Sequence, residues 1–268
     1  MDKRWVVGAG VGVTAALAVA AAWAAPHAGK PATIAQPENW LTAKGYLPKG
    51  ALDGTALLGP PPAPDSLIGQ ADRQRFDETR ALQGTPRWSL ATQDADLNQG
   101  ILHRYSCAVG GQIGDATPTL KHLLLKLQYD VREVGNAPKD HYLRPRPLIG
   151  NDKPLCVKRE NWMVTNASYP SGHSMIGWSW ALVLSELAPD RAETLMENAR
   201  DFGESRVICG VHYQSDVDAG RVLGSAMVAR EHAEPAFKAD LARARVELER
   251  ARKGPAPQDC GIYAAGGG

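Results

Sequence analysis

The chemistry that stands out first lies between Ser205 and Asp216, where a histidine is followed four residues later by a carboxylate. Asp216 can accept the hydrogen on Nδ1 of His212, which fixes the tautomer and leaves Nε2 free as a nucleophile. We expect Arg206 to end one helix, His212 to lie in the connection, and Asp216 to occupy the first turn of the next. A structural His–Asp hydrogen bond would give the same pattern, so both interpretations stay open for this segment alone.

A second candidate segment, Tyr169-Pro170-Ser171-Gly172-His173, stands directly before an apolar run that begins at Ser174. If that run is a helix, the amides of its first turn have no partner within the helix and form its positive end. Gly172 lets an anion approach this backbone closely. His173 would then lie within reach of a bound anion. A helix cap followed by a core histidine remains the alternative.

The third segment, Lys139 to Pro147, combines basic residues with two prolines, Pro145 and Pro147. Because the prolines break helix, we expect Lys139 and Arg146 to project from an extended strap. A solvated basic loop would also fit this composition.

The elements that must position these segments have a helical pattern. Leucines and valines recur at three- and four-residue steps from Leu120 to Val134, after a proline that suits a first helical turn. Further helices are expected over Ser66–Leu82, Ser174–Leu187, Arg191–Ile208, Ser215–Met227 and Pro235–Lys253, with Ser215 and Asp218 as a capping box. Alternating strand patterns are scarce. The sequence therefore predicts an all-α, single-domain bundle of roughly seven to ten helices.

The ends of the chain differ from this helical region in composition. Lys3 and Arg4 precede an apolar run that ends in Ala22-Trp23-Ala24, the pattern of a cleaved signal peptide over residues 1–24, with a permanent anchor as the alternative. Residues 25–64 are rich in Pro and Gly and are expected to form an extended segment, followed by the helical domain over 65–253. The glycine-rich residues 254–268 are expected to be a flexible tail. The sequence thus predicts a periplasmic or secreted protein with no membrane segment after signal cleavage.

Charge and cysteine content limit the possible partners. The 30 basic and 29 acidic side chains nearly cancel, so no nucleic-acid partner is expected. The four cysteines, Cys107, Cys156, Cys209 and Cys260, lack CxxC spacing, which argues against a zinc knuckle. In an oxidising compartment they can form two disulfides, and three connectivities are open.

In order, the three segments give Lys-x6-Arg-Pro, Pro-Ser-Gly-His and Ser-Arg-x5-His-x3-Asp. This order resembles the signature of the type 2 phosphatidic-acid-phosphatase superfamily, which also contains the vanadium haloperoxidases. Every signature position is filled, by Lys139, Arg146, Pro147, Pro170, Ser171, Gly172, His173, Ser205, Arg206, His212 and Asp216. The resemblance implies an all-α bundle of this phosphatase and haloperoxidase type.

Further stretches are similar to the secreted bacterial class A non-specific acid phosphatases, from about Leu47 to Lys253. They include Thr85-Pro86-Arg87-Trp88, Asp94-Ala95-Asp96 and the run from Gly203 to Gly210. Two positions depart from that group: Ala167 stands where Gly is usual, and Tyr213 where Trp is usual. Both departures concern the wall of the site and leave every catalytic group in place.

The resemblance implies hydrolysis of small-molecule phosphate monoesters without cofactor or metal. His212 would be the nucleophile that forms a phosphohistidine, Asp216 its partner, and His173 the general acid and base. The phosphate would be held by the remaining site residues, namely Lys139, Arg146, Ser171, Gly172 and Arg206. Because one imidazole must be charged and the other neutral, mildly acidic pH is expected to favour the reaction. The resemblance also implies a homo-oligomer.

Four other functions remain to be weighed against this one. A lipid phosphatase of the same superfamily would place its site between transmembrane helices, which the sequence does not predict. A vanadate-dependent haloperoxidase or an apyrase-like nucleotide diphosphohydrolase could use the same scaffold. A phosphate-binding protein without turnover would leave the His173, His212 and Asp216 set unexplained. The preferred ester is not predicted by the sequence.

Overall fold

The computed structural model describes residues 44–264, and every regular element in that range is a helix. Eight of the α-helices have eight or more residues, and the other three are single turns. The elements are α1 (Gly54–Leu58), α2 (Leu67–Thr79), η1 (Arg80–Leu82), α3 (Pro86–Gln93), α4 (Gln99–Val109), α5 (Pro118–Tyr142), α6 (Trp162–Thr165), α7 (Gly172–Leu187), η2 (Pro189–Arg191), α8 (Ala192–Ile208), α9 (Gln214–Glu231), α10 (Pro235–Ala251) and α11 (Gly261–Ala264). The all-α prediction is confirmed.

The helix at the centre of the core is α7, which packs against α5, α8 and α9. Its sequence is apolar around most of its circumference, and Met175, Trp180, Val183 and Leu184 are fully buried. The indole N–H of Trp180 donates to the carbonyl of Leu124 on α5 at 2.8 Å, so this large side chain leaves no buried donor unpaired. The core therefore holds the start of α7 in place between three neighbours.

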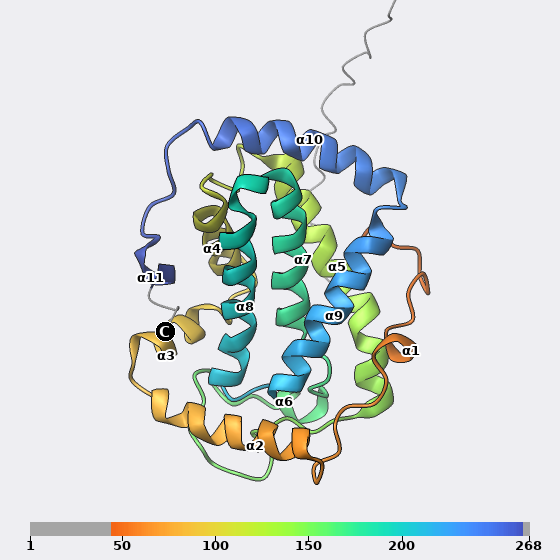
Figure 1. The fold of residues 1–268 in the computed structure, drawn as a ribbon, viewed down its shortest axis with the longest axis vertical. Helices are drawn as coiled ribbons and strands as arrows, with labels where there is room; N and C mark the ends of the chain where they lie inside the picture. The colour runs from red at the N-terminus through yellow and green to blue at the C-terminus, as the bar shows by residue number, and fades with distance from the viewer. Residues whose placement is uncertain (1–43, 265–268) are drawn as a thin grey trace, which may run out of the picture. The chain divides into compact units, whose positions relative to one another are not determined.

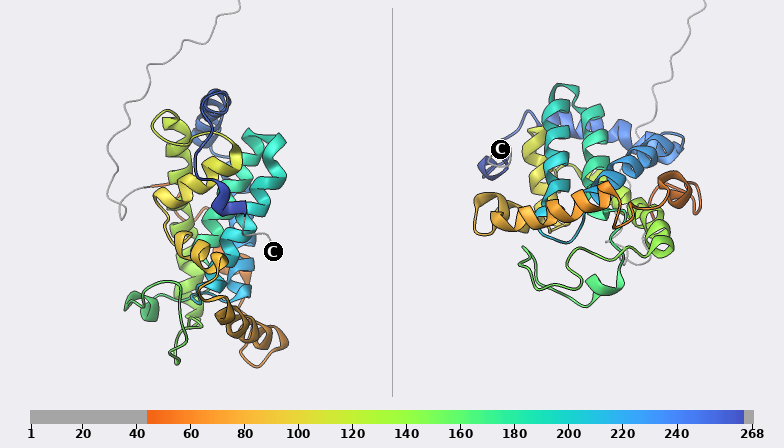
Figure 2. Two further views of the ribbon diagram at one scale, coloured as in Figure 1. Left: turned by 90° about the vertical axis from the view of Figure 1, so that its left-hand side faces the viewer. Right: turned by 60° about the horizontal axis from the view of Figure 1, so that its bottom comes forward.

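The long helices α5, α7, α8 and α9 lie alongside one another, with α10 across one end and α2 across the other (Figure 1). Successive helices alternate in direction, so the C-terminal ends of α5 and α8 meet the N-terminal ends of α7 and α9 at the end where α2 lies. The segment 143–168, which links α5 to α7 and contains α6, lies at this same end (Figure 2). This arrangement brings together all three sequence segments that could carry chemistry.

One segment differs from the sequence prediction: Lys139 lies on a helix and not on a strap. Helix α5 continues through Pro138 and ends at Tyr142, where Leu143 adopts a left-handed conformation with φ 50°. Pro138 falls in the last turns of the helix, and the break comes only before Pro145. Arg146 does lie in the extended segment that follows, as predicted.

The start of α9 also differs from the prediction in its capping residues. Tyr213 is the N-cap, and its amide donates to Oδ2 of Asp216 at 2.8 Å. Ser215 lies inside the helix and bonds Asp72 of α2 through its amide and its hydroxyl. Asp216 occupies the first turn of α9, as expected, because its carboxylate pairs with the helix N-terminus.

Two disulfides resolve the pairing that the sequence left open: Cys107 with Cys260 and Cys156 with Cys209. The first joins α4 to the C-terminal segment, in which the Tyr263 hydroxyl lies 2.7 Å from Nδ1 of His103. A covalent bond and a side-chain hydrogen bond therefore attach part of the predicted flexible tail, residues 254–268, to α4. The second disulfide joins the segment after α5 to the end of α8.

The N-terminal predictions fall only partly within residues 44–264. The predicted signal peptide, residues 1–24, and the first part of the predicted extended segment lie outside the described residues. Of that segment, 44–64 contains the short helix α1, and Tyr46 is buried against the core, with its amide bonded to Asp130 at 2.6 Å. No helix over the described range is long and apolar enough to cross a bilayer.

Candidate active site

The eight residues predicted to form the site come together where α5, α7, α8 and α9 meet. Lys139 comes from the last turn of α5 and Arg146 from the segment after it. The start of α7 supplies Ser171, Gly172 and His173, the end of α8 supplies Arg206, and the α8–α9 connection and first turn of α9 supply His212 and Asp216. Six of the eight are buried, and Gly172 and His173 are half-buried.

Two hydrogen bonds fix the orientation of His212. A guanidinium N–H of Arg146 lies 3.1 Å from Nε2, and Oδ2 of Asp216 lies 3.4 Å from Nδ1. Because a guanidinium only donates, Nε2 must be the acceptor and the proton must lie on Nδ1, facing the carboxylate. The lone pair of Nε2 therefore points toward the cationic side of the site. The backbone holds this position as well, since the amide of His212 donates to the carbonyl of Arg206 at 3.3 Å.

Asp216 has a partner that the sequence analysis missed, Arg144. The side chain of Asp216 is 0% exposed, and its Oδ1 accepts from Arg144 at 2.6 Å. Arg144 also donates to Asp72 of α2 at 2.8 Å, so one guanidinium bridges two buried carboxylates. Burial raises the pKa of Asp216, and the charge of Arg144 is the strongest influence in the opposite direction. The alternating arginines of Leu-Arg-Pro-Arg-Pro were a possible signal, but nothing near Asp72 in the sequence marks it as their partner.

Three buried cations act on His212: Arg146 by a hydrogen bond to Nε2, and Lys139 and Arg206 through their charge. Within residues 44–264, no carboxylate is in hydrogen-bond contact with any of the three. Lys139 donates to the carbonyl of Ala167 at 2.6 Å, and Arg146 donates to Asn166, Val211 and His212. A guanidinium N–H of Arg206 lies 3.9 Å from the sulfur of Cys209, and its buried Nε has no partner within the described residues. Buried charges of one sign are costly unless they are neutralised. The arrangement therefore fits a bound anion.

Burial and mutual repulsion shift the titration of these groups. The pKa of Lys139 falls to about 7 because the ammonium is desolvated and lies near Arg146. Burial lowers the pKa values of Arg146 and Arg206 to about 10. The pKa of His212 lies well below its ordinary value because of burial, with Arg146, Lys139 and Arg206 acting in the same direction. At mildly acidic pH, His212 is therefore neutral in the free protein, as a nucleophile must be.

His173 faces the same site from the first turn of α7. Its Nε2 lies 3.2 Å from the carbonyl of Ala95, and a carbonyl only accepts, so Nε2 carries a hydrogen and Nδ1 is the atom left for other partners. The ring stacks on Phe202 with centroids 6.1 Å apart. Burial, followed by the charge of Arg206, lowers the pKa of His173 well below its ordinary value. His173 is therefore not expected to be charged in the free protein. A bound dianion would favour its charged form and so provide the protonated His173 that the sequence predicts.

The start of α7 has the geometry of an anion site. Ser171 is the N-cap, and its amide donates to the carbonyl of Asp216 at 2.9 Å, which ties α7 to the start of α9. A β-carbon placed on Gly172 would meet no atom within 4 Å, so open space lies beside the first-turn amides. The positive end of a helix of 16 residues faces that space.

One signature residue, Ser205, lies outside the group that faces the lone pair. Its hydroxyl donates to Asp94 at 2.5 Å and accepts from Arg87 at 2.9 Å. Asp94 in turn forms a buried ion pair with Arg104 at 2.8 Å. Ser205 thus belongs to a structural network next to Arg206 and does not face the anion site.

The two departures from the class A pattern lie at the wall of the site. Ala167 contributes the carbonyl that accepts from Lys139, which a glycine at the same place would also supply. The ring of Tyr213 lies under the guanidinium of Arg144, 4.3 Å from centroid to carbon, and its hydroxyl accepts from Arg73 at 2.6 Å. Neither departure removes a charged group from the site.

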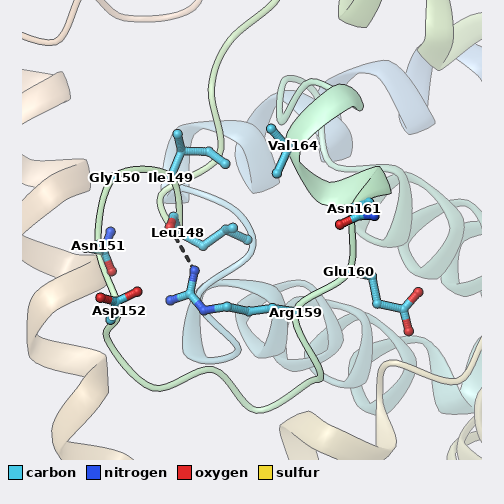
Figure 3. Close-up of a pocket in the computed structure, with 9 residues that line it drawn as sticks. All are labelled: Leu148, Ile149, Gly150, Asn151, Asp152, Arg159, Glu160, Asn161 and Val164. Atoms are coloured by element: carbon cyan, nitrogen blue, oxygen red, sulfur yellow. Dashed lines mark hydrogen bonds between the residues drawn. The ribbon is translucent and has the colours of Figure 1, made fainter.

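Two hollows border this region. The larger, of about 480 Å³, lies within the segment between α5 and α7, where a guanidinium N–H of Arg159 donates to the carbonyl of Leu148 at 3.0 Å (Figure 3). None of its nine lining residues is a predicted site residue. The smaller, of about 150 Å³, is lined in part by Lys139, Gly172 and His173. Only the smaller hollow shares residues with the candidate site.

Comparison with known proteins gives a consistent family. The model of the PAP2 superfamily matches residues 126–233. An acid phosphatase of Zymomonas mobilis is 42% identical over 206 residues, covering 75% of this chain and 77% of that protein. Non-specific acid phosphatases of Salmonella typhimurium and Providencia stuartii are 39% and 37% identical, each covering 76% of this chain and, respectively, 83% and 84% of those proteins. A crystal structure of a transmembrane PAP2-type phosphatidylglycerolphosphate phosphatase from Bacillus subtilis aligns with 63% of this chain and 87% of that one at 18% identity, with a TM-score of 0.47.

The family model and the three acid phosphatases, together with the helical fold and the cationic site, define a phosphatase of the PAP2 superfamily. Within that superfamily the chain belongs to the class A non-specific acid phosphatases.

Proposed function

We propose that this acid phosphatase hydrolyses phosphate monoesters through a phosphohistidine on His212. The observation that carries the proposal is the set of three buried cations, Lys139, Arg146 and Arg206, whose charges all act on His212, with Arg146 bonded to its Nε2 lone pair. A phosphoryl group would neutralise that charge, and its phosphorus would lie in front of Nε2. Positive charge fixed around the transferring group is the main source of catalysis in phosphoryl transfer.

In the first step, Nε2 of His212 forms a bond to phosphorus while the bond from phosphorus to the ester oxygen breaks. Arg146 exchanges its hydrogen bond to Nε2 for one to a phosphoryl oxygen, which frees the lone pair. Asp216 stabilises the imidazolium that develops on His212. His173, protonated once the bound dianion opposes the effect of Arg206, gives its Nδ1 proton to the departing oxygen.

In the second step, His173 takes a proton from water as the water oxygen attacks phosphorus. The bond from phosphorus to Nε2 breaks, and inorganic phosphate and neutral His212 remain. The proposal includes no metal, because the cations of the site already oppose the charge of the phosphate. We therefore expect full turnover in the presence of a chelator.

We further propose a periplasmic or extracellular location and small-molecule substrates. The location is supported by the two disulfides, which persist in oxidising compartments, and by the signal-peptide pattern at residues 1–24. A homo-oligomer without nucleic-acid or membrane partners is part of the same proposal.

The proposed roles of the two histidines separate when the leaving group is varied. His212→Ala should abolish turnover of every ester, because no nucleophile remains. His173→Ala should lose nearly all kcat/KM for an alkyl phosphate but less for a dinitrophenyl ester, whose oxygen leaves without a proton in the first step. Circular dichroism of both variants serves as the control for folding. Equal loss of kcat/KM in His173→Ala for both esters would contradict its role as general acid, because kcat/KM reports the first step and not the later hydrolysis. Wild-type turnover in His212→Ala would contradict the phosphohistidine.

A further inference from the structure

The smaller hollow has an apolar wall directly beside the proposed general acid. Its apolar lining comes from Leu97, Val131, Gly135, Met175 and Ile176, on the connection before α4, on α5 and on α7. Two polar residues of α5, half-buried Arg132 and exposed Asn136, also line it, so the hollow opens to solvent on that side. The amide of Gln128, another lining residue, is already used in a hydrogen bond to the carbonyl of Leu97 at 3.1 Å. The hollow therefore offers mainly apolar contacts to a ligand.

The position of this hollow relates it to the ester and not to the phosphate. The proposed acid, His173, must reach the ester oxygen, so the organic group attached to that oxygen begins next to His173. His173 and Gly172 line the hollow on one side, and Lys139 lines it from α5. An ester whose phosphoryl group lies among the cations would thus direct its organic group into the apolar space.

Glycine at position 135 keeps this space open. Gly135 lies inside α5, where glycine is unfavourable, and it is buried. A β-carbon there would come within 3.1 Å of the sulfur of Met175 on α7, so even a small side chain would crowd the hollow. The volume, about 150 Å³, equals that of a protein cavity known to bind benzene.

We propose that the hollow between α5 and α7 is a leaving-group subsite for an aryl ring, so that aryl phosphates are preferred substrates. This inference rests on the proposed function, because it needs the phosphoryl group among the three cations. Burying a ring in apolar surroundings is favourable by the hydrophobic effect, while the phosphate contacts are the same for every monoester.

Two phosphonates test the subsite without any chemical step: phenylphosphonate and methylphosphonate, each measured as a competitive inhibitor. In the wild-type enzyme, phenylphosphonate should bind about tenfold more tightly or better, given the apolar area of the ring. Gly135→Val should bring the ratio of the two inhibition constants close to one by filling the hollow. Leu97→Asn, at a half-buried position less critical for folding, should lower the same ratio about threefold or more.

The matched control is Leu67→Asn on α2, the same chemical change at a side chain that is 84% exposed and outside the hollow. It should leave the ratio unchanged. A wild-type ratio near one, or full preference for phenylphosphonate in both Gly135→Val and Leu97→Asn, would overturn the subsite alone. If neither phosphonate nor inorganic phosphate inhibited the wild-type enzyme, the proposed phosphate site would fail together with the subsite.

Discussion

Two buried arginines, Arg104 and Arg206, lie on neighbouring helices and have opposite surroundings. Arg104 on α4 is 1% exposed and bonds both oxygens of Asp94, at 2.8 and 3.0 Å, and two oxygens of Asn198. Arg206 on α8 is 4% exposed, contacts a sulfur, and leaves its Nε unpaired within the described residues. A buried charge with all its partners supports the fold, whereas a buried charge that lacks them indicates a ligand.

The largest effect on activity among the arginines is expected at Arg206. Under the proposed function, Arg206→Gln removes a donor to the phosphoryl group, so kcat/KM should fall by about 10²- to 10³-fold. The free energy of unfolding should stay the same or rise, because the variant no longer buries an unpaired charge. Steady-state kinetics and urea unfolding measure the two quantities. A large loss of stability with normal kcat/KM would show that Arg206 supports the fold.

The opposite result is expected at Arg104. Arg104→Ala leaves Asp94 buried without its ion pair, which should lower the free energy of unfolding by about 3–5 kcal/mol. The kcat/KM of the folded fraction should change far less than in Arg206→Gln. A stable but inactive Arg104→Ala protein would contradict the structural role assigned to Arg104.

Arg104 and Arg206 also show which features of the site cannot be predicted from the sequence. Two local relations are confirmed. Asp216 lies four residues after His212, in the first turn of α9, and its Oδ2 is 3.4 Å from Nδ1 of that imidazole. The apolar run after Ser174 is a helix that starts at the site. Nothing local separates Arg104 from Arg206, because their partners come from contacts between helices. Arg144 was missed for the same reason, since its partner Asp72 is 72 residues away in the chain.

The prolines misled the prediction in a different way. Pro145 and Pro147 lead the sequence to predict an extended strap around Lys139, but a proline restricts chiefly the residue before it and its own turn. Helix α5 ends at Tyr142, just short of that influence, and so places Lys139 at the site on a rigid element. The disulfide pairing and the anchored C-terminal segment were equally beyond local patterns, because both depend on the tertiary fold.

A smaller effect, visible mainly in the pH profile, is expected at Arg144. Arg144→Gln removes the strongest influence that lowers the pKa of Asp216, so this pKa should rise. The carboxylate would then be lost as the pH falls through a higher value, and the acidic limb of the kcat profile should move to higher pH. Charges from other elements also act on Asp216, namely Lys139 of α5 and His212 itself.

A conservative variant shows whether Arg144 acts by keeping Asp216 ionised beside His212, which we call its positioning role, or only supports the fold. We expect kcat to fall about 10- to 100-fold in Arg144→Gln at mildly acidic pH. Arg144→Lys should restore part of the rate and part of the acidic limb, because it keeps the charge. An unchanged pH profile in Arg144→Gln would contradict the positioning role.

The smallest expected change is produced by Lys139→Arg and concerns the basic limb of the dependence of kcat/KM on pH. Lys139 has a pKa of about 7, so its cation is present below that pH and is lost as the pH rises through it. The kcat/KM value should therefore decline above about pH 7. In Lys139→Arg the charge persists, and the limb should move to higher pH. Using one substrate for both enzymes cancels the ionisation of the ester itself, so an identical limb in the variant would exclude Lys139 as its origin.

A shifted basic limb in Lys139→Arg would also change the explanation of why the enzyme prefers acidic pH. The sequence suggested a charged His173 beside a neutral His212, each near an ordinary imidazole pKa. In the structure both imidazoles have lowered pKa values, because burial and the nearby cations disfavour their charged forms. Acidic preference is therefore expected to come from Lys139 in the free enzyme and from His173 only after the phosphate has bound.

The most direct test of the phosphohistidine is to isolate it. Enzyme turning over phenyl phosphate would be quenched under denaturing alkaline conditions, digested, and analysed by mass spectrometry for one added phosphoryl group. We predict the modification on the peptide that contains His212, at the imidazole, and its absence from His212→Ala. Phosphate on any other residue, or turnover with no phosphoryl group on His212 in a quench fast enough to trap the first turnover, would contradict the proposed mechanism.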